Sequence, residues 1–195
     1  MISELNKIFP EYKIINKKKY YEILVDKDDL YKTIKKLKEN QKLAFDQLID
    51  ITAVDYPSKE SRFELIYIFL SMVLNERIIL KFLLKENENA ESITSIHKAA
   101  DWYERECYDL FGINFLNHPD LRRIMTDYNF EGHPLRKDFP LTGHTEVRYD
   151  DLEKKVIYEP VKLSQEFRNF DYVSPWEGIP NFLVGDDKAS EENDQ

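Results

Sequence analysis

Two long runs of β-branched, aromatic and other apolar residues follow one another near the middle of the chain, and they constrain its fold more than any other feature. The first covers residues 62–74, the second covers residues 77–85, and only Asn75-Glu76 lies between them. Two such runs joined by a short polar turn are typical of an antiparallel β-hairpin. Three shorter runs extend the pattern, at residues 13–15, 20–25 and 45–56. The sequence therefore predicts a mainly antiparallel sheet.

The segment between the second and third of these strands has the pattern of an amphipathic helix. Leu30, Ile34 and Leu37 recur at helical spacing within residues 28–40. Either of the aspartates at its start, Asp28 or Asp29, is suited to accept hydrogen bonds from the free amides of the first turn.

A second helix is predicted to begin between Ser92 and Ser95 and to end at Gly112, a favourable residue for a helix C-cap. Its apolar stripe consists of Ile96, Ala99, Ala100, Tyr103, Cys107, Leu110 and Phe111. Arg105 and Asp109 are four residues apart and can pair along the helix. Glu106 lies at the edge of the stripe and is the acid that we expect to be carried inward. Helices packed on such a sheet define an α+β fold.

Beyond Gly112 the chain is rich in turns and in charge. Prolines and glycines recur through residues 117–144 and predict an irregular path, and a β-hairpin is expected from residues 146–149 and 155–158. The segment 120–138 holds four basic residues and four acidic ones: Arg122, Arg123, Arg136, Lys137, Asp120, Asp127, Glu131 and Asp138. This balance indicates matched ion pairs, either within the fold or across a subunit interface, because the planar guanidinium group of arginine grips carboxylates with defined geometry.

The last part of the chain contains five aromatic residues in a segment with little periodicity: Phe167, Phe170, Tyr172, Trp176 and Phe182. Such a segment suits an extended arm that anchors aromatic side chains in another protein, or one that folds back on its own domain. The pattern divides the chain into an α+β core domain (1–115), a turn-rich segment with an extended arm (116–185) and an acidic tail (186–195) that we expect to be disordered.

Composition and spacing argue against several functions. The formal net charge of −9 disfavours nucleic acid and anionic membrane surfaces as partners. A single cysteine, Cys107, can form neither an intramolecular disulfide nor a four-thiolate iron–sulfur cluster. The five glycines never form a phosphate-binding loop, so NADH is not expected to bind this chain. The longest apolar run, residues 65–74, is too short to cross a membrane, and the start of the chain shows no targeting segment.

The polar residues of the second helix and the following turns also match no catalytic or metal-binding pattern. Glu104 and Glu106 are two residues apart, so on a helix they point away from each other and do not form a catalytic carboxylate pair. The separations of Cys107, His118, His133 and His144 fit no compact zinc site. A free-standing hydrolase that uses Glu106 and His133 remains as an alternative of a different class.

Several motifs together resemble the 30 kDa subunit family (the C subunits) of the proton-pumping NADH:quinone oxidoreductase, respiratory complex I. They are the run Glu104-Arg105-Glu106 with Asp109-Leu110-Phe111, then His118 with the run 119–124, the run 132–140, the run 146–149, and the late run 170–177. The resemblance covers about residues 21–178. Its signature residues are Glu104, Arg105, Glu106, Asp109, His118, Arg122, Arg123, His133, Arg136, Lys137, Asp138, Phe170 and Trp176.

The resemblance implies a non-catalytic core subunit of the peripheral arm, bound beside the larger quinone-site subunit, which is the D subunit of the complex. NADH, FMN, iron–sulfur clusters and quinone would then be bound by the assembly, a proton translocase, and this chain would hold no cofactor. It implies peripheral association, through the complex only, with the cytoplasmic side of a bacterial inner membrane or the matrix side of a mitochondrial one. The alternative is the equivalent subunit of a membrane-bound hydrogenase or of a quinone oxidoreductase with another electron donor.

Overall fold

A computed structural model describes residues 2–165 of the chain. Two compact units can be distinguished; the first ends at Glu146 and the second begins at Val147. Residues 116–146 of the predicted turn-rich segment belong to the same unit as the predicted core domain. In the part of the chain that is described, we find no helix with the length and apolar character needed to span a membrane.

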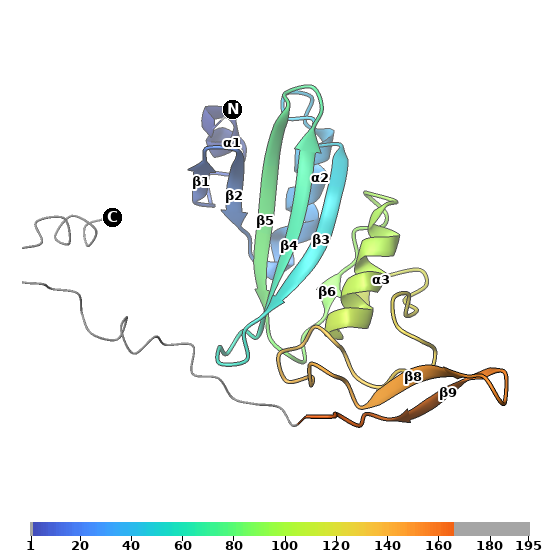
Figure 1. Cartoon of the computed structure of the whole chain (residues 1–195). Helices are drawn as coiled ribbons and strands as arrows, with labels where there is room; N and C mark the ends of the chain where they lie inside the picture. The colour runs from blue at the N-terminus through green and yellow to red at the C-terminus, as the bar shows by residue number, and fades with distance from the viewer. Residues whose placement is uncertain (1, 166–195) are drawn as a thin grey trace, which may run out of the picture. The chain divides into compact units, whose positions relative to one another are not determined.

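A five-stranded sheet forms the centre of the first unit (Figure 1). Its strands are β1 (Ile14–Lys17), β2 (Tyr20–Leu24), β3 (Gln47–Asp55), β4 (Phe63–Ser71) and β5 (Glu76–Leu84), in the order β1-β2-β5-β4-β3. All neighbours are antiparallel except β2 and β5, which are parallel. With the helices described below, this confirms the predicted α+β fold.

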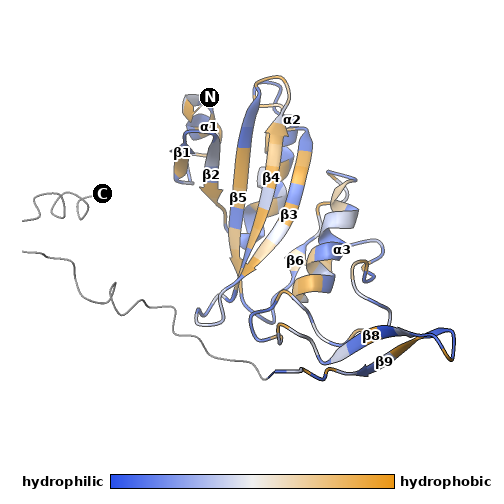
Figure 2. Ribbon diagram, viewed as in Figure 1, coloured by the Kyte–Doolittle hydropathy of each residue, from blue (hydrophilic) through white to orange (hydrophobic). Residues whose placement is uncertain are grey.

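The central strands alternate between the core and the opposite face, and apolar residues dominate them (Figure 2). Phe63, Leu65, Tyr67 and Phe69 of β4 are all buried. The predicted hairpin is confirmed, but β4 ends at Ser71, and the apolar residues that follow belong to an exposed four-residue turn. The turn closes at Asn75, whose φ is 52°, a left-handed conformation that asparagine tolerates better than most residues.

Two helices precede the long strands. The first, α1 (Ile2–Ile8), was not predicted, and it buries Leu5. The second, α2 (Leu30–Glu39), confirms the predicted helix and buries Leu30, Ile34 and Leu37. The predicted aspartate cap is wrong, because a short 3-10 helix (Lys27–Asp29) leads into α2 and places Asp29 in a helical conformation. The Asp29 carboxylate instead accepts hydrogen bonds from Tyr12 and Lys32.

The third helix, α3 (Ala100–Phe111), begins later than predicted. Residues before it form the short strand β6 (Ala90–Glu91), which pairs in parallel with β7 (Phe115–Leu116), and a set of turns. The Cys107 thiol donates to the carbonyl of Ile51 on the edge strand β3 at 3.3 Å, so α3 packs along this edge. Gly112 is the C-cap, as predicted, with φ at 73°.

No helix or strand forms between Asn117 and His144, in agreement with the predicted irregular path. The hairpin that follows, β8 (Thr145–Asp150) and β9 (Lys155–Pro160), is also confirmed, although its turn is four residues long. Arg148 of β8 donates to Glu159 of β9 at 2.8 Å.

We predict that Gly112→Ala lowers the free energy of unfolding by about 2–3 kcal/mol. A Cβ atom at Gly112 would lie 2.6 Å from both Arg136 and His133, and alanine is also strained at this φ. Gly143→Ala is the matched control, since its φ is 70° but its nearest contact would be at 3.9 Å, so it should cost only about 1 kcal/mol. Urea denaturation measures both losses, and equal losses would contradict the predicted steric contribution.

Candidate functional site

The segment that follows α3 and carries the motifs of residues 118–140, here called the signature segment, is held to the rest of the first unit by buried carboxylates. Asp55, Glu104 and Asp109 are each no more than 3% exposed. An irregular segment leaves its main-chain N–H groups without the partners that a helix or a sheet supplies, so they need acceptors from elsewhere. Asp109 and Asp55 accept such N–H groups from this segment, and Glu104 accepts one from the turns before α3.

Asp109, on α3, organises the segment from Arg123 to Thr126. Its Oδ2 accepts the main-chain N–H groups of Ile124, Met125 and Thr126 at 3.0, 2.7 and 2.8 Å. Its Oδ1 accepts the Thr126 hydroxyl at 2.6 Å and Arg123 Nη1 at 3.3 Å. Burial alone would raise the pKa of Asp109, but these hydrogen bonds outweigh it and hold the pKa below its usual value.

The arginines near Asp109 bind the main chain as well as acids. Arg123 Nη2 donates to the carbonyl of Gly132 at 3.0 Å. Arg105, on α3, does not pair with Asp109 as predicted; its Nε donates to the carbonyl of Arg122 at 3.0 Å. The prediction from helical spacing is wrong because the Asp109 carboxylate is fully used by the segment 123–126.

Asp55, at the end of β3, binds the far end of the signature segment. Arg62 grips both of its carboxylate oxygens, at 2.8 and 3.0 Å, and the main-chain N–H of Lys137 donates to Oδ2 at 2.7 Å. Arg62 also contacts Glu86 at 2.8 Å and Asp138 at 2.9 Å. The hydrogen bonds from Arg62 hold the pKa of Asp55 below its usual value in spite of burial.

Arg136 joins the same cluster from the signature segment. Its Nε donates to the carbonyl of Phe111, the last residue of α3, at 2.6 Å, and its Nη1 donates to Glu86 at 3.2 Å. The guanidinium groups of Arg136 and Arg62 each lie 5.3 Å from the ring centroid of Phe63. Arg136 therefore ties the end of α3 to the turn that follows β5 and to the start of β4.

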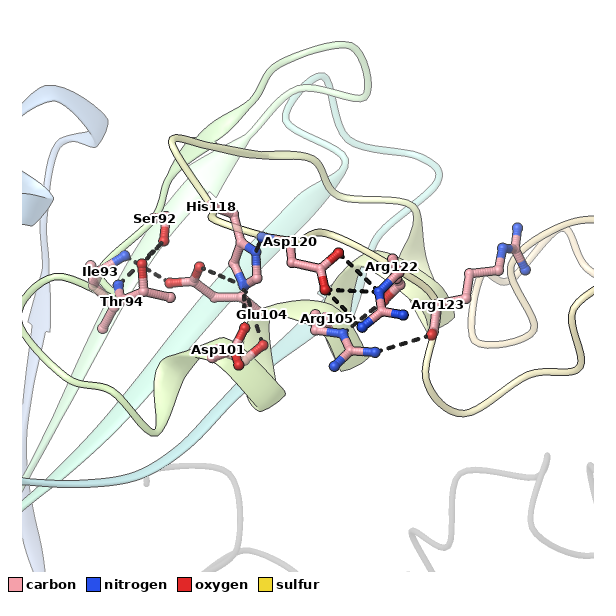
Figure 3. Close-up of polar contacts among 10 residues, drawn as sticks. All are labelled: Ser92, Ile93, Thr94, Asp101, Glu104, Arg105, His118, Asp120, Arg122 and Arg123. Atoms are coloured by element: carbon pink, nitrogen blue, oxygen red, sulfur yellow. Dashed lines mark hydrogen bonds and ion pairs between the residues drawn. The ribbon is translucent and has the colours of Figure 1, made fainter.

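Glu104, in the middle of α3, forms a third cluster with His118 (Figure 3). Its Oε1 accepts the main-chain N–H of Ile93 at 2.7 Å, and its Oε2 lies 3.8 Å from His118 Nε2. The His118 side chain is fully buried, and Nε2 also lies 3.2 Å from the carbonyl of Asp101. Because His118 Nδ1 accepts the N–H of Asp120, the ring proton is assigned to Nε2, which points at these oxygens.

Burial raises the pKa of Glu104 to about 7, more than the hydrogen bond from Ile93 lowers it. Among the described residues, Glu104 Oε2 has no hydrogen-bond partner. The prediction that Glu106 is the acid carried inward is wrong, since Glu106 is half-buried while Glu104 and Asp109 are fully buried. The reason is that α3 contacts β3 on one side and the turns before and after it on other sides. Residues outside its apolar stripe are therefore buried as well.

The remaining signature residues differ in how firmly they are bound. His133 Nδ1 lies 2.8 Å from the carbonyl of Asp109, whereas the exposed guanidinium group of Arg122 pairs with Asp120. Within residues 2–165, no group of three His, Cys, Asp or Glu side chains could hold a metal ion. Phe170 and Trp176 lie outside the described residues.

Asp55, Arg62 and Glu86 were not predicted from the sequence as site residues. Asp55 did carry a signal, because it shares the inward parity of Ile51 and Ala53 along β3. A carboxylate at an inward position of a strand requires a buried partner, and Arg62 is the nearest arginine in the sequence. Glu86 carried no comparable signal.

Comparison with known protein families gives one match that covers most of this unit. Residues 23–145 match the family described as "Respiratory-chain NADH dehydrogenase, 30 Kd subunit". All three clusters lie within the matched range.

Individual proteins that are similar to this chain support the same family. The chain is 54% identical over 169 residues to the C subunit of NADH-quinone oxidoreductase from Hyphomonas neptunium, in an alignment that covers 87% of this chain and 84% of the relative. It is 58% identical over 153 residues to the protein of the same name from Cereibacter sphaeroides, covering 78% and 76% of the two chains. Among solved structures, a chain of the archaeal membrane-bound sulfane sulfur reductase, a respiratory membrane complex, is similar with a TM-score of 0.63 and 25% identity, covering 72% of this chain and 84% of that one.

We predict that Asp109→Asn lowers the free energy of unfolding at pH 7 by about 3 kcal/mol, because the amide would present donors to groups that are themselves donors. The pKa of Asp109 is depressed in the folded chain, so its contribution is present above the ordinary value of 3.8 and is lost as the pH falls below it. Urea denaturation at pH 7 and pH 3.5 measures the difference from the wild type, which should shrink at the lower pH. The control Asp120→Asn, in an exposed pair, should leave stability nearly unchanged.

We predict the opposite pH dependence for Glu104→Gln. The pKa of Glu104 is raised from 4.5 to about 7 in the folded chain, so its contribution to stability is complete below pH 4.5 and is lost as the pH rises through 7. The wild type should therefore lose about 3 kcal/mol relative to the glutamine variant between these limits. Urea titrations from pH 4.5 to 8 check this, with Glu106→Gln on the same helix as the control. A difference that does not change with pH would contradict the raised pKa.

Proposed function

Because the chain belongs to the 30 kDa subunit family of the respiratory-chain NADH dehydrogenase, we propose that it acts as a non-catalytic core subunit of the peripheral arm of NADH:quinone oxidoreductase. It supports the larger quinone-site subunit, the D subunit, in an assembly that couples electron transfer from NADH to quinone with proton translocation. In this role the chain determines the geometry of its neighbour, and the cofactors (NADH, FMN, iron–sulfur clusters and quinone) bind elsewhere in the assembly.

The observation that supports this proposal best is that the charged signature residues form hydrogen bonds and ion pairs within the fold. The signature residues Asp109, Arg123 and Arg136 bind one another or the main chain at 2.6–3.3 Å, and Asp55, outside the signature, binds the main chain of Lys137 at 2.7 Å. These contacts turn a segment without regular secondary structure into a defined surface. A surface of this kind suits the packing of one subunit against another, since preorganisation lowers the entropic cost of association.

The carboxylates are poorly placed for acid–base chemistry on a substrate. Glu104 has a pKa near neutrality, as a general acid or base would, but its side chain is fully buried beside His118. For the alternative hydrolase, Glu106 and His133 would need to act together. His133 Nδ1 is instead engaged by the Asp109 carbonyl, which favours a structural role for this ring.

The alternative assembly, with another electron donor, is favoured less by the comparisons. The archaeal sulfane sulfur reductase complex contains a chain of similar fold, but at 25% identity. The relatives named as subunits of NADH-quinone oxidoreductase are 54% and 58% identical. We therefore propose NADH as the donor and peripheral attachment, through the complex, to the cytoplasmic side of the inner membrane or the matrix side of its mitochondrial equivalent. Purification of the complex in mild detergent, followed by identification of its subunits and cofactors, separates the two assemblies.

Arg136→Ala in the assembled complex tests the architectural role. Loss of its bonds to Phe111 and Glu86 should loosen the signature segment, and the amount of intact complex on a native gel should fall several-fold, as expected for a loss of roughly 2 kcal/mol. NADH:quinone activity normalised to intact complex should stay near normal. Arg77→Ala, at an exposed position on β5 outside the signature, is the control.

A different result for Arg136→Ala would contradict a purely architectural role. Fully assembled complex whose normalised activity is reduced a hundredfold, about 2.7 kcal/mol of activation free energy, would show that this residue helps to shape the quinone reaction.

A further inference from the structure

We propose that the loop from Arg123 to Gly132, here called the 123–132 loop, is a docking element that inserts Met125 and Tyr128 into an apolar pocket with a basic rim on a different subunit. This proposal rests on the proposed function, because it names a contact surface within such an assembly. It goes further in assigning the surface to a particular loop and the partner site to a particular chemistry.

The 123–132 loop is closed at its base. Arg123 Nη2 donates to the carbonyl of Gly132 at 3.0 Å, so the two ends of the loop are joined directly. A turn bond from the N–H of Phe130 to the carbonyl of Asp127, at 3.0 Å, shapes its second half. Compact surface loops with joined ends are frequently functional.

The first half of the loop is fixed from within the protein. Three consecutive N–H groups, from Ile124 to Thr126, converge on the buried carboxylate of Asp109. The second half is fixed by aromatic packing, because the rings of Phe130 and Phe139 lie 5.7 Å apart. The main chain that carries the outward side chains is therefore held in a defined position.

The outward side chains include two large residues with apolar surface. Met125 is 62% exposed, although its own N–H group points inward to Asp109, and Tyr128 is 100% exposed. Tyrosine is enriched among the residues that contribute most to binding at protein interfaces. A rigid loop loses little conformational entropy when such side chains are buried by a partner.

The charges of the 123–132 loop decide the chemistry of the partner. Arg123 is turned inward to Asp109 and Gly132, so its positive charge is compensated within the fold. Glu131 is exposed three residues beyond Tyr128, and Asp127, whose Oδ1 accepts the main-chain N–H of Tyr128 at 3.0 Å, is exposed directly before it, so acidic groups dominate the outer surface of the loop. A pocket with a basic rim complements this surface.

A second copy of this chain would fit the loop less well than another protein of the assembly. The formal net charge of the chain is −9, and two identical acidic loops would repel each other. The partner is therefore a different protein, with arginine or lysine around an apolar pocket.

The decisive experiment places the photo-crosslinking residue p-benzoyl-phenylalanine at position 128 of the full chain within the assembled complex. Irradiation should join the chain to one other subunit, and mass spectrometry should find the attachment beside arginine or lysine. A crosslink to a second copy of the chain, or no crosslink in an assembled complex, would overturn the proposal.

A variant pair provides the second measurement. Tyr128→Ser should reduce the amount of chain that co-purifies with the complex at least tenfold. The melting temperature of the isolated full chain should stay within about 1 °C of the wild type, because the side chain is 100% exposed among residues 2–165. The control Val73→Ser, at a 78% exposed position in the β4–β5 turn, should assemble normally. Normal assembly of Tyr128→Ser would contradict the docking role. Failure of the wild-type chain itself to join any complex would instead contradict the proposed function.

Discussion

The hydrogen bonds that converge on the buried carboxylate of Asp109 are the interaction on which the functional surface depends. The segment from Asn117 to His144 has neither helix nor strand, so nothing regular satisfies its main-chain N–H groups. Asp109 accepts three of them in sequence, and Arg123 and Thr126 complete its shell. One side chain of α3 thus performs part of the role that a neighbouring strand performs in a sheet.

The same arrangement recurs twice in the first unit. Asp55 accepts the N–H of Lys137 at the end of the signature segment, and Glu104 accepts the N–H of Ile93 before α3. The three carboxylates differ in their electrostatic surroundings. Arg62 keeps the pKa of Asp55 low, and hydrogen bonds from the segment 124–126 keep the pKa of Asp109 low. For Glu104 burial dominates and raises the pKa to about 7.

These contacts give a physical meaning to the charged motifs by which the family is known. Their arginines and acids close the signature segment onto α3 and onto the end of β3, and Arg136 joins the end of α3 to Glu86 in the turn after β5. The exposed residues between these attachment points include Met125 and Tyr128, for which we propose contact with another subunit. An architectural role requires a surface of this kind more than it requires a pocket with reactive groups.

The sequence by itself determined the α+β class, the central hairpin, α2, the C-cap at Gly112, the irregular path after it and the β8–β9 hairpin, because each depends on local periodicity or on turn residues. It also identified the family through motifs of defined spacing. Only the tertiary structure decided that Glu104 and not Glu106 is buried, that Arg105 binds main-chain carbonyls instead of Asp109, and that Asp55, Arg62 and Glu86 belong to the site. These outcomes depend on which segments, as many as 82 residues apart for Asp55 and Lys137, come into contact, and periodicity along one element carries no information about such contacts.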